Sequence, residues 1–407
     1  MRDEMKKVPR LRFRGFSEDW ELCKLGQVAN YRRGSFPQPY GNKEWYDGEN
    51  SMPFVQVVDV GDNLRLVEDT KQKISELAQP KSVFVKEGKV VVTLQGSIGR
   101  VAITQYPAYV DRTLLIFESY KAEMDEYYFA YVIQQLFEYE KTRAPGGTIK
   151  TVTKEALSDF TISFPSIEEQ KKLGKFFEQL DDTITLHQRK LDQLKELKKA
   201  YLQLMFPKKD ETVPRVRFAD FEDDWQLCKL GDVVEIFDGT HQTPRYTDSG
   251  VKFVSVENIA TLETKKYITH EAYEKEYSKK RAKKGDILMT RIGDIGTMKV
   301  IETDEPLAYY VTLALLKAKE TNPYFLSFII SSPEIQRNIW KRTLHIAFPK
   351  KINLGEINQV EMKITIFEEQ DKIGDLFTNL DDAIILNQNK LNQLKSLKKS
   401  YLQNMFI

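Results

Sequence analysis

The sequence predicts an α+β protein with two tandem β-rich globular bodies, separated by two long helices that form an antiparallel coiled coil with pseudo-twofold symmetry. Three observations support this fold class. The chain has 407 residues, which is too long for one ordinary hydrophobic core. A long helical pattern, "LDDTITLHQRKLDQLKELKKAYLQLMF" (180–206), returns almost unchanged as "LDDAIILNQNKLNQLKSLKKSYLQNMF" (380–406). Segments of the body before each helix recur as well, so each half of the chain is one structural unit.

The repeated segments show which parts of the bodies are alike. "VPRLRFRGFSEDWELCKLGQV" (8–28) returns as "VPRVRFADFEDDWQLCKLGDV" (213–233), and both bodies contain a Thr-x-x-Gly-x-Ile-Gly turn, at 93–99 and 290–296. In contrast, "RRGSFPQPYGNKEWYDG" of the first body has no visible match in "FDGTHQTPRYTDSG" of the second. We therefore expect the two bodies to share their repeated outer segments and to differ in the segments between them. The predicted boundaries are 1–165 for the first body, 166–207 for the first helix, 208–363 for the second body and 364–407 for the second helix.

Both long helices place apolar residues in alternating steps of four and three, which is the seam of a coiled coil. Each seam has one polar residue near its middle, His187 in the first helix and Asn387 in the second. In an antiparallel pair the midpoints meet, so these two residues would fix register and orientation; a partly exposed position without a special role is the alternative. Toward the end of each seam lies a lysine, Lys198 or Lys398.

Each helix is expected to begin at a capping box, formed by Ser166 with Glu169 and by Thr365 with Glu368. Pro207 ends the first helix, because proline has no amide hydrogen to donate. About forty residues at 1.5 Å per residue span roughly 60 Å. Antiparallel pairing would therefore hold the two bodies at opposite ends of a stiff rod.

Two stretches carry positive charges and no acid, at corresponding places before the final strand that leads into each helix. They are "KTRAPGGTIKTVTK" (141–154) and "QRNIWKRTLHIAFPKKINLG" (336–355). Such a local excess of charge, mixed with hydroxyl groups and glycine, suits contacts with phosphate groups; a solvated basic face is the alternative. The candidate residues are Arg143, Thr148 and Lys150 in the first stretch, and Lys341, Arg342, Lys350 and Lys351 in the second.

The loops after the first strands and the glycine turns supply the remaining candidates. Arginine can pair with the edge of guanine and glutamine with that of adenine, each through two hydrogen bonds. Glycine in the turns allows a sharp bend or close approach to a ligand; a plain hairpin turn is the alternative. The candidates are Arg32, Arg33 and Gln38 in the first loop, Thr240, His241, Gln242, Arg245 and Tyr246 in the second, and Gln95, Ser97, Arg100 and Arg291 in or beside the turns.

Signatures of catalysis are absent from the sequence. It has no Gly-x4-Gly-Lys-Ser/Thr phosphate loop, and its 4 histidines and 2 cysteines make no metal-binding pattern. "NPYF" (322–325) lacks the second proline of the amino-methyltransferase motif.

Cys23 and Cys228 occupy equivalent places in the repeat and are expected to be buried free thiols, which suits a reducing cytoplasm. With a net charge of +1, no apolar run long enough to cross a membrane and no secretory signal, any nucleic-acid surface must come from local patches.

Over essentially its whole length, the chain resembles the specificity subunit of type I restriction–modification systems. The resemblance rests on "W-x-L-C-K-L-G" at 20–26 and 225–231, the "G-x-I-G" turns, and the helices that begin with "EEQ" at 168–170 and 368–370. Residues 1–7 have no counterpart in the repeat.

The resemblance implies a non-catalytic subunit whose two target-recognition domains each read one half of a split, asymmetric target in double-stranded DNA. It also implies that the paired helices act as a spacer that docks two methyltransferase subunits, joined by two restriction subunits. S-adenosylmethionine, ATP and magnesium would then belong to those partners, and this chain would bind no cofactor itself.

Two other classes of function stay open from the residues alone. One is the recognition half of a fused methyltransferase–nuclease, which the missing catalytic motifs oppose. The other is a coiled-coil scaffold that never touches DNA. An affinity that does not change with salt concentration would favour it, because phosphate contacts release counterions.

Overall fold

The computed structural model describes residues 8–61, 63–143 and 157–406. The chain forms two units: unit 1 contains residues 1–189 with 389–407, and unit 2 contains residues 190–388. Each unit therefore holds one body, together with the start of one long helix and the end of the other. This division confirms the predicted fold class of two β-rich bodies and two long helices, α4 (Ile167–Leu204) and α10 (Phe367–Met405).

The body of unit 1 is built from two sheets and one large helix. Its five-stranded sheet has the order β2-β10-β7-β8-β4, its four-stranded sheet the order β5-β3-β9-β6, and β1 pairs with β11 just before α4 begins. The elements are β1 (Glu21–Lys24), α1 (Leu25–Val28), β2 (Ala29–Arg33), β3 (Met52–Val55), β4 (Leu64–Arg65), β5 (Gln72–Ile74), β6 (Val83–Val85), β7 (Val90–Thr93), β8 (Val101–Ile103), β9 (Ala108–Val110), β10 (Leu114–Tyr120), α2 (Glu126–Arg143) and β11 (Thr161–Phe164). Short 3-10 turns lie at Lys43–Trp45, Val57–Asp59 and Gln79–Lys81.

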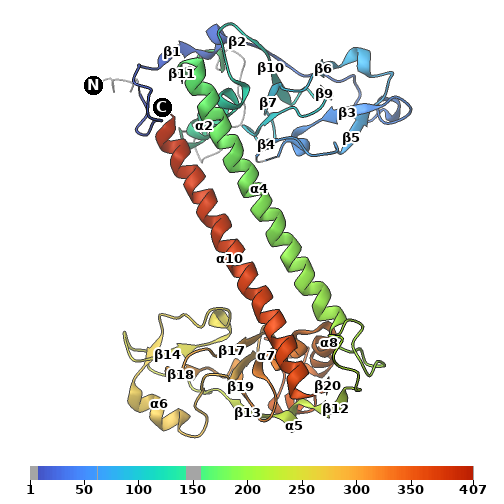
Figure 1. Ribbon diagram of the computed structural model, residues 1–407, viewed down its shortest axis with the longest axis vertical. Coiled ribbons are helices and arrows are strands. Elements are labelled where there is room, and N and C mark those ends of the chain that lie inside the picture. The colour runs from blue at the N-terminus through green and yellow to red at the C-terminus, as the bar shows by residue number, and fades with distance from the viewer. Residues whose placement is uncertain (1–7, 62, 144–156, 407) are drawn as a thin grey trace. The chain divides into compact units, whose positions relative to one another are not determined.

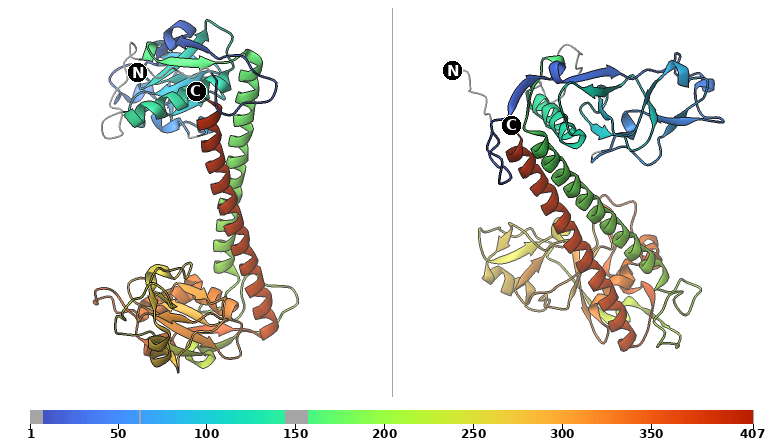
Figure 2. Two further views of the ribbon diagram at one scale, coloured as in Figure 1. Left: turned by 90° about the vertical axis from the view of Figure 1, so that its left-hand side faces the viewer. Right: turned by 45° about the horizontal axis from the view of Figure 1, so that its top comes forward.

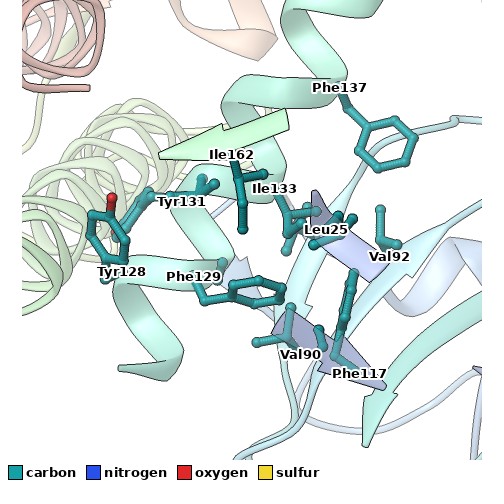
Figure 3. Close-up of a cluster of buried hydrophobic side chains, with 14 of the residues drawn as sticks. Leu25, Val90, Val92, Phe117, Tyr128, Phe129, Tyr131, Ile133, Phe137 and Ile162 are labelled. Atoms are coloured by element: carbon teal, nitrogen blue, oxygen red, sulfur yellow. The ribbon is translucent and has the colours of Figure 1, made fainter. Parts of the chain in front are cut away.

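Helix α2 covers one face of the five-stranded sheet. Asp125 begins the helix by accepting a hydrogen bond from the amide of Tyr128 at 2.9 Å. Phe129 of α2 then lies against Phe117 of β10, with ring centroids 4.8 Å apart, and near Val90 of β7 (Figure 3). The central strand β7 is buried along its whole length, so it reads as an apolar run rather than an alternating one.

The body of unit 2 repeats this plan with different details. Its sheets have the orders β13-β19-β16-β17 and β15-β14-β18, and β12 pairs with β20 before α10 begins. The elements are β12 (Gln226–Lys229), α5 (Leu230–Val233), β13 (Val234–Asp238), β14 (Val251–Val254), a 3-10 turn (Val256–Asn258), β15 (Tyr267–Ile268), α6 (His270–Tyr277), β16 (Ile287–Thr290), β17 (Met298–Val300), β18 (Leu307–Tyr309), β19 (Leu313–Ala318), α7 (Pro323–Ser331), α8 (Pro333–Arg342), α9 (Leu354–Asn358) and β20 (Glu361–Ile364).

The "NPYF" stretch is the start of α7. Asn322 is its N-cap and accepts a hydrogen bond from the amide of Phe325 at 3.0 Å, while Pro323 occupies the first helical position. The side-chain amide of Asn322 also donates to Asp371 of α10 at 2.6 Å. The motif therefore starts a helix and fixes it to α10.

Within each unit the two long helices run antiparallel. In unit 1, Phe177 of α4 packs on Phe406 at the end of α10, with ring centroids 5.5 Å apart, and Asp181 forms an ion pair with Lys398 at 2.6 Å. Figures 1 and 2 show the course of the two helices. As the residue number rises along α4, the number of its partner falls along α10.

Unit 2 repeats these contacts with the roles of the helices exchanged. Lys198 of α4 lies 2.6 Å from Asp381 of α10, and Phe206 stacks on Phe377 at 5.7 Å. The two seam lysines, Lys198 and Lys398, therefore each have an aspartate partner on the opposite helix.

The predicted capping boxes are wrong in detail. Glu169 is 1% exposed and accepts two hydrogen bonds at 2.7 Å from Arg12, and these bonds raise the pKa of the guanidinium. At the start of α10, Thr365 donates to Glu369 rather than to the exposed Glu368. The carboxylate of Glu369 is held by Arg217 through two bonds of 2.8 Å. The start of each long helix is thus fixed to the segment that opens its body, through Arg12 in unit 1 and Arg217 in unit 2.

Candidate nucleic-acid interface

In unit 2, several loops meet at one edge of the sheet. Strand β13 ends at Asp238, which pairs with Ala314, and β16 ends at Thr290, which pairs with Leu313 at the start of β19. Antiparallel neighbours bring the end of one strand beside the start of the next. The loops after β13, after β16 and before β19 therefore share this edge, which we call the loop edge of unit 2.

The residues of the first loop lie largely at the surface. His241, Gln242, Arg245 and Tyr246 are exposed, whereas Thr240 is 7% exposed. The imidazole of His241 lies 2.7 Å from the carboxylate of Asp238, at the end of β13. The loop edge thus presents a histidine, an amide, a guanidinium and a phenol from a single segment.

The structure corrects the prediction that Arg291 contacts DNA. Its side chain is 8% exposed and its guanidinium forms an ion pair with Asp238 at 2.6 Å. It also donates to the carbonyl oxygens of Val311 at 3.2 Å and Ile352 at 3.3 Å. Arg291 therefore ties the loops together from inside and does not offer its charge at the surface.

The basic stretch 336–355 reaches the same edge. Lys351 forms bridges with Ile292 and Leu344, and the amide of Gly293 donates to the carbonyl of Lys350 at 2.9 Å. Lys350 is exposed, and Lys351 is partly exposed. The structure thus brings two predicted phosphate-binding lysines beside the predicted base-reading loop.

Lys341 and Arg342 lie on the last turn of α8. Lys341 is exposed, but Arg342 donates to Asn338 at 2.9 Å and lies 3.2 Å from Glu356. Because the carboxylate of Glu356 compensates its charge, Arg342 is the weaker candidate of the two for a phosphate contact.

Unit 1 has an equivalent edge. Strand β2 ends at Arg33, which pairs with Leu115, and β7 ends at Thr93, which pairs with Leu114 at the start of β10. The candidates Arg32, Arg33 and Gln38 after or within β2, and Gln95 and Ser97 in the glycine turn, are exposed. Arg32 lies 3.8 Å from Glu118, and Arg100 donates to the carbonyl of Val60 at 3.3 Å.

Sequence reasoning missed a polar centre at this edge of unit 1. Asp111 is 2% exposed and accepts hydrogen bonds from the Tyr40 hydroxyl at 2.6 Å and the Thr113 amide at 2.9 Å. Burial and the bond to Asp111 raise the pKa of Tyr40 well above its ordinary value. The guanidinium of Arg112 lies over the Tyr40 ring, 4.9 Å from its centroid. The neighbouring "YVDRT" run (109–113) was the available signal.

The glycine turns have a structural explanation. Gly99 and Gly296 adopt φ values of 82° and 93°, where side chains are disfavoured. A Cβ on Gly99 would lie 2.7 Å from the Cβ of Phe137, and one on Gly296 would lie 2.6 Å from Gln336. The Thr93 hydroxyl, fully buried, accepts from the amide of Arg100 at 3.0 Å. These contacts account for the residues that the two turns share, and only the exposed residues of the turns stay candidates.

Three candidates of the first basic stretch lie outside the described side chains. They are Arg143, Thr148 and Lys150.

A second set of residues that sequence reasoning missed is apolar. Trp340, Ile346 and Phe348 lie in the basic stretch of unit 2, yet they are 53%, 98% and 103% exposed. The signal was the "HIAF" run, which lies inside a stretch that stands out by its positive charges.

The register residues remain predictions. Asn387 is 9% exposed and donates to the carbonyl of Ala383 in its own helix at 2.7 Å. The Nδ1 atom of His187 is buried and has no hydrogen-bond partner within the described part of the chain.

Across the described residues, no group of three His, Cys, Asp or Glu side chains is placed to hold a metal ion. Cys23 and Cys228 are free thiols, as predicted, but each is only partly buried. Desolvation raises the pKa of Cys228 to about 11, so it is an unreactive thiol at neutral pH. Within the same described ranges, no helix is long and apolar enough to span a membrane.

Comparison of the sequence with known protein families shows which family the chain belongs to. The type I restriction modification DNA specificity domain matches residues 17–196 and again residues 222–396. The chain belongs to this family. As a type I specificity subunit, it is a non-catalytic DNA-recognition subunit of a restriction–modification system.

Relatives of this specificity subunit align along most of its length. The MjaVIII specificity subunit of Methanocaldococcus jannaschii is 22% identical over 402 residues, covering 95% of this chain and 91% of the relative. The EcoBI specificity subunit of Escherichia coli is 21% identical and covers 96% of this chain and 86% of its own. The S subunit of M. genitalium shares the fold, with a TM-score of 0.67 at 15% identity, over 98% of this chain and 99% of that one.

Proposed function

We propose that the specificity subunit selects a bipartite, asymmetric target in double-stranded DNA, with each unit reading one half-site. The observation that carries this proposal is that each unit presents a loop edge at the equivalent place in its own sheet, with unlike side chains on the two edges. Like frames would approach DNA in the same way, and unlike loops would then read different bases.

The chemistry of the two loop edges supports different half-sites. Unit 1 presents Arg33 and Gln38, whereas unit 2 presents His241, Gln242 and Arg245. Arginine suits a guanine edge and glutamine an adenine edge, each through two hydrogen bonds. In unit 2, Lys350 and its neighbours add charge for phosphate groups, which carry no sequence information.

We also propose that the long helices dock two methyltransferase subunits. Leucines on these helices are left exposed in pairs that recur 200 positions apart: Leu186 and Leu386 are 65% and 70% exposed, and Leu197 and Leu397 are 40% and 41% exposed. A repeated apolar surface fits two copies of one partner. Restriction subunits would join the same assembly, and S-adenosylmethionine, ATP and magnesium would be bound by these partners, with none held by this chain.

The test is co-expression with the cognate methyltransferase in a host without other N6-methyladenine, followed by mapping of that base across the genome. The proposal predicts methylation at a split motif with two unlike halves and a fixed gap. A single uninterrupted motif would contradict it. Methylation by this chain alone would favour a fused enzyme, and an affinity that is indifferent to salt concentration would favour a scaffold that makes no phosphate contacts.

A further inference from the structure

The loop after α8 projects a short apolar tip at the loop edge of unit 2. The amide of Leu344 donates to the carbonyl of Lys351 at 2.7 Å, and this bond closes the hairpin at its base. We call residues 345–350, "HIAFPK", the tip. Because Ile292 pairs with Lys351, and the amide of Gly293 donates to Lys350, the base of the tip is fixed to the glycine turn.

Two large side chains of the tip are left uncovered by the part of the chain that the structure describes. Ile346 is 98% exposed and Phe348 is 103% exposed, which are the two highest values among the described residues that are large and hydrophobic. Burial of apolar side chains drives folding, so leaving two of them fully in water is unfavourable for an isolated protein. A contiguous exposed apolar group of this kind marks an interaction site.

The surroundings of the tip are basic and ordered. The ammonium of Lys350 lies 4.6 Å from the ring centroid of Trp340, and the His345 ring lies 4.3 Å from the same ring. The imidazole Nε2 of His345 is also 2.9 Å from the carbonyl of Trp340. In the described part of the chain, no carboxylate forms an ion pair with Lys341, Lys350 or Lys351. The tip therefore combines apolar side chains with uncompensated positive charge.

This combination favours DNA over a protein partner. The centres of protein–protein interfaces are depleted in charged residues, and lysine above all is rare there. Proteins that distort DNA, in contrast, insert Phe, Ile or Pro between base pairs while neighbouring cations hold the phosphate groups. The tip lies at the same edge as His241 and Gln242, since Arg291 bonds to both Asp238 and Ile352.

We infer that Phe348, supported by Ile346, inserts between two base pairs of the half-site read by unit 2 and unstacks them. This inference rests on the proposed function and adds to it a residue that reads deformability. A flexible step such as TA or CA would open at lower cost than other steps, so the wedge would add sequence preference without a hydrogen bond to any base.

The experiment measures unstacking directly. The full chain, in complex with its methyltransferase subunits, is titrated onto a duplex that carries the mapped target and has 2-aminopurine at one position at a time. The target adenines are left out, because a methyltransferase extrudes its own target base. We expect a rise in fluorescence at one step of one half-site. Phe348→Ala should abolish this rise and weaken binding by about tenfold to a hundredfold, the loss seen when one stacked aromatic side chain is removed.

Controls separate the wedge from other causes. Leu227→Ala removes another exposed side chain of unit 2, which is 66% exposed, and should behave like the wild type. Phe348→Trp keeps a flat ring and should keep the fluorescence rise. Since Phe348 is fully exposed, its variants should fold, and their salt dependence of binding should be unchanged.

The outcomes distinguish this inference from the proposed function. If the wild type binds the target without any rise, or if Phe348→Ala matches Leu227→Ala, the wedge is wrong while DNA recognition stands. If the wild type does not bind the duplex at all, both fail. Loss of the methyltransferase subunits from the Phe348→Ala complex, with unstacking retained, would make the tip a protein contact and overturn the wedge.

Discussion

Arg12 and Arg217 each hold a buried carboxylate at the start of a long helix, and each does so with two hydrogen bonds. Glu169 and Glu369 are 1% and 0% exposed, so these side chains depend on their partners for compensation of charge. A buried pair adds little net stability when complete, but removing one partner leaves an uncompensated charge. The two pairs therefore act as fixed joints between the segments that open the bodies and the helices that follow them.

Replacing Arg217 by Ala should destabilise unit 2 by about 3 kcal/mol, because the Glu369 carboxylate would remain buried without its partner. Denaturant unfolding, with hydrogen exchange to locate the affected unit, measures the change. Arg215→Ala is the matched control: Arg215 lies two residues away, is 53% exposed in its pair with Glu211, and should change little.

The double variant Arg217→Ala with Glu369→Gln should recover part of the loss, since it removes the charge together with its partner. Equal destabilisation in Arg215→Ala and Arg217→Ala would contradict the role given to burial.

Lys341 and Lys350 should contribute to DNA affinity regardless of sequence. Changing either to Gln should lower the slope of log affinity against log salt concentration by about 0.9, the value for one lost phosphate contact. Lys284→Gln is the control, because Lys284 precedes β16 and so lies at the opposite end of the strand from Thr290. A loss confined to a single base position would mean that these lysines read bases directly.

The candidate site was predictable at the level of loops and not of individual side chains. The sequence predicted a base-reading loop with His241, Gln242 and Arg245 and, separately, a basic stretch at 336–355, and the structure brings the two together. It could not reveal that Arg291 is buried, because its partner Asp238 lies 53 positions away and is brought close only by the sheet register. Nor does charge counting detect an apolar tip, whose exposure depends on what the rest of the fold leaves uncovered.

At the scale of elements, the long helices are the part of the fold that the sequence defines best. Their apolar period continues over many turns and occurs twice, so helix type, pairing and approximate length all follow from the pattern. Lys198 and Lys398 could be placed in the seam, but their partners Asp381 and Asp181 come from the opposite helix and required the register. The capping boxes failed for a similar reason: the distant Arg12 binds Glu169, and Thr365 bonds to Glu369, which Arg217 holds, and not to Glu368.

The crossing of α4 over α2 depends on a glycine. A Cβ on Gly174 would lie 2.4 Å from Oδ1 of Asp125 and 2.9 Å from the backbone nitrogen of Tyr128. Gly174→Ala should therefore destabilise unit 1 by about 1–3 kcal/mol, the usual cost of overpacking. The equivalent Gly374→Ala should cost less, because its nearest atom is 3.1 Å away.

Gly355 of α9 provides the control, since a Cβ there would have no atom within 4 Å. Gly355→Ala should leave stability unchanged or raise it slightly. Denaturant unfolding compares the three variants, and equal effects at Gly174 and Gly355 would contradict the close crossing.

At the scale of the whole molecule, two continuous helices of 38 and 39 residues each begin in one unit and end in the other. If they set the separation of the half-sites, the gap in the target should follow helix length. Duplicating residues 188–194 in α4 together with residues 388–394 in α10 adds one heptad to both and keeps the seam in register.

Seven residues lengthen a helix by roughly 10 Å, and each base pair occupies about 3.4 Å of duplex, so the gap should widen by about three base pairs. Mapping of N6-methyladenine reads the gap directly. Duplication in α4 alone is the control, because it displaces one seam against the other and should abolish methylation. An unchanged gap in the matched variant would show that the helices do not act as a spacer.

The central claim is that the two units share one framework and that each unit reads its own half-site independently of the other. The most direct measurement replaces residues 30–160 with those of a related specificity subunit and maps N6-methyladenine in cells that contain the cognate methyltransferase. The account predicts a new first half-site, with the second half-site and the gap unchanged. A change in both half-sites would contradict it.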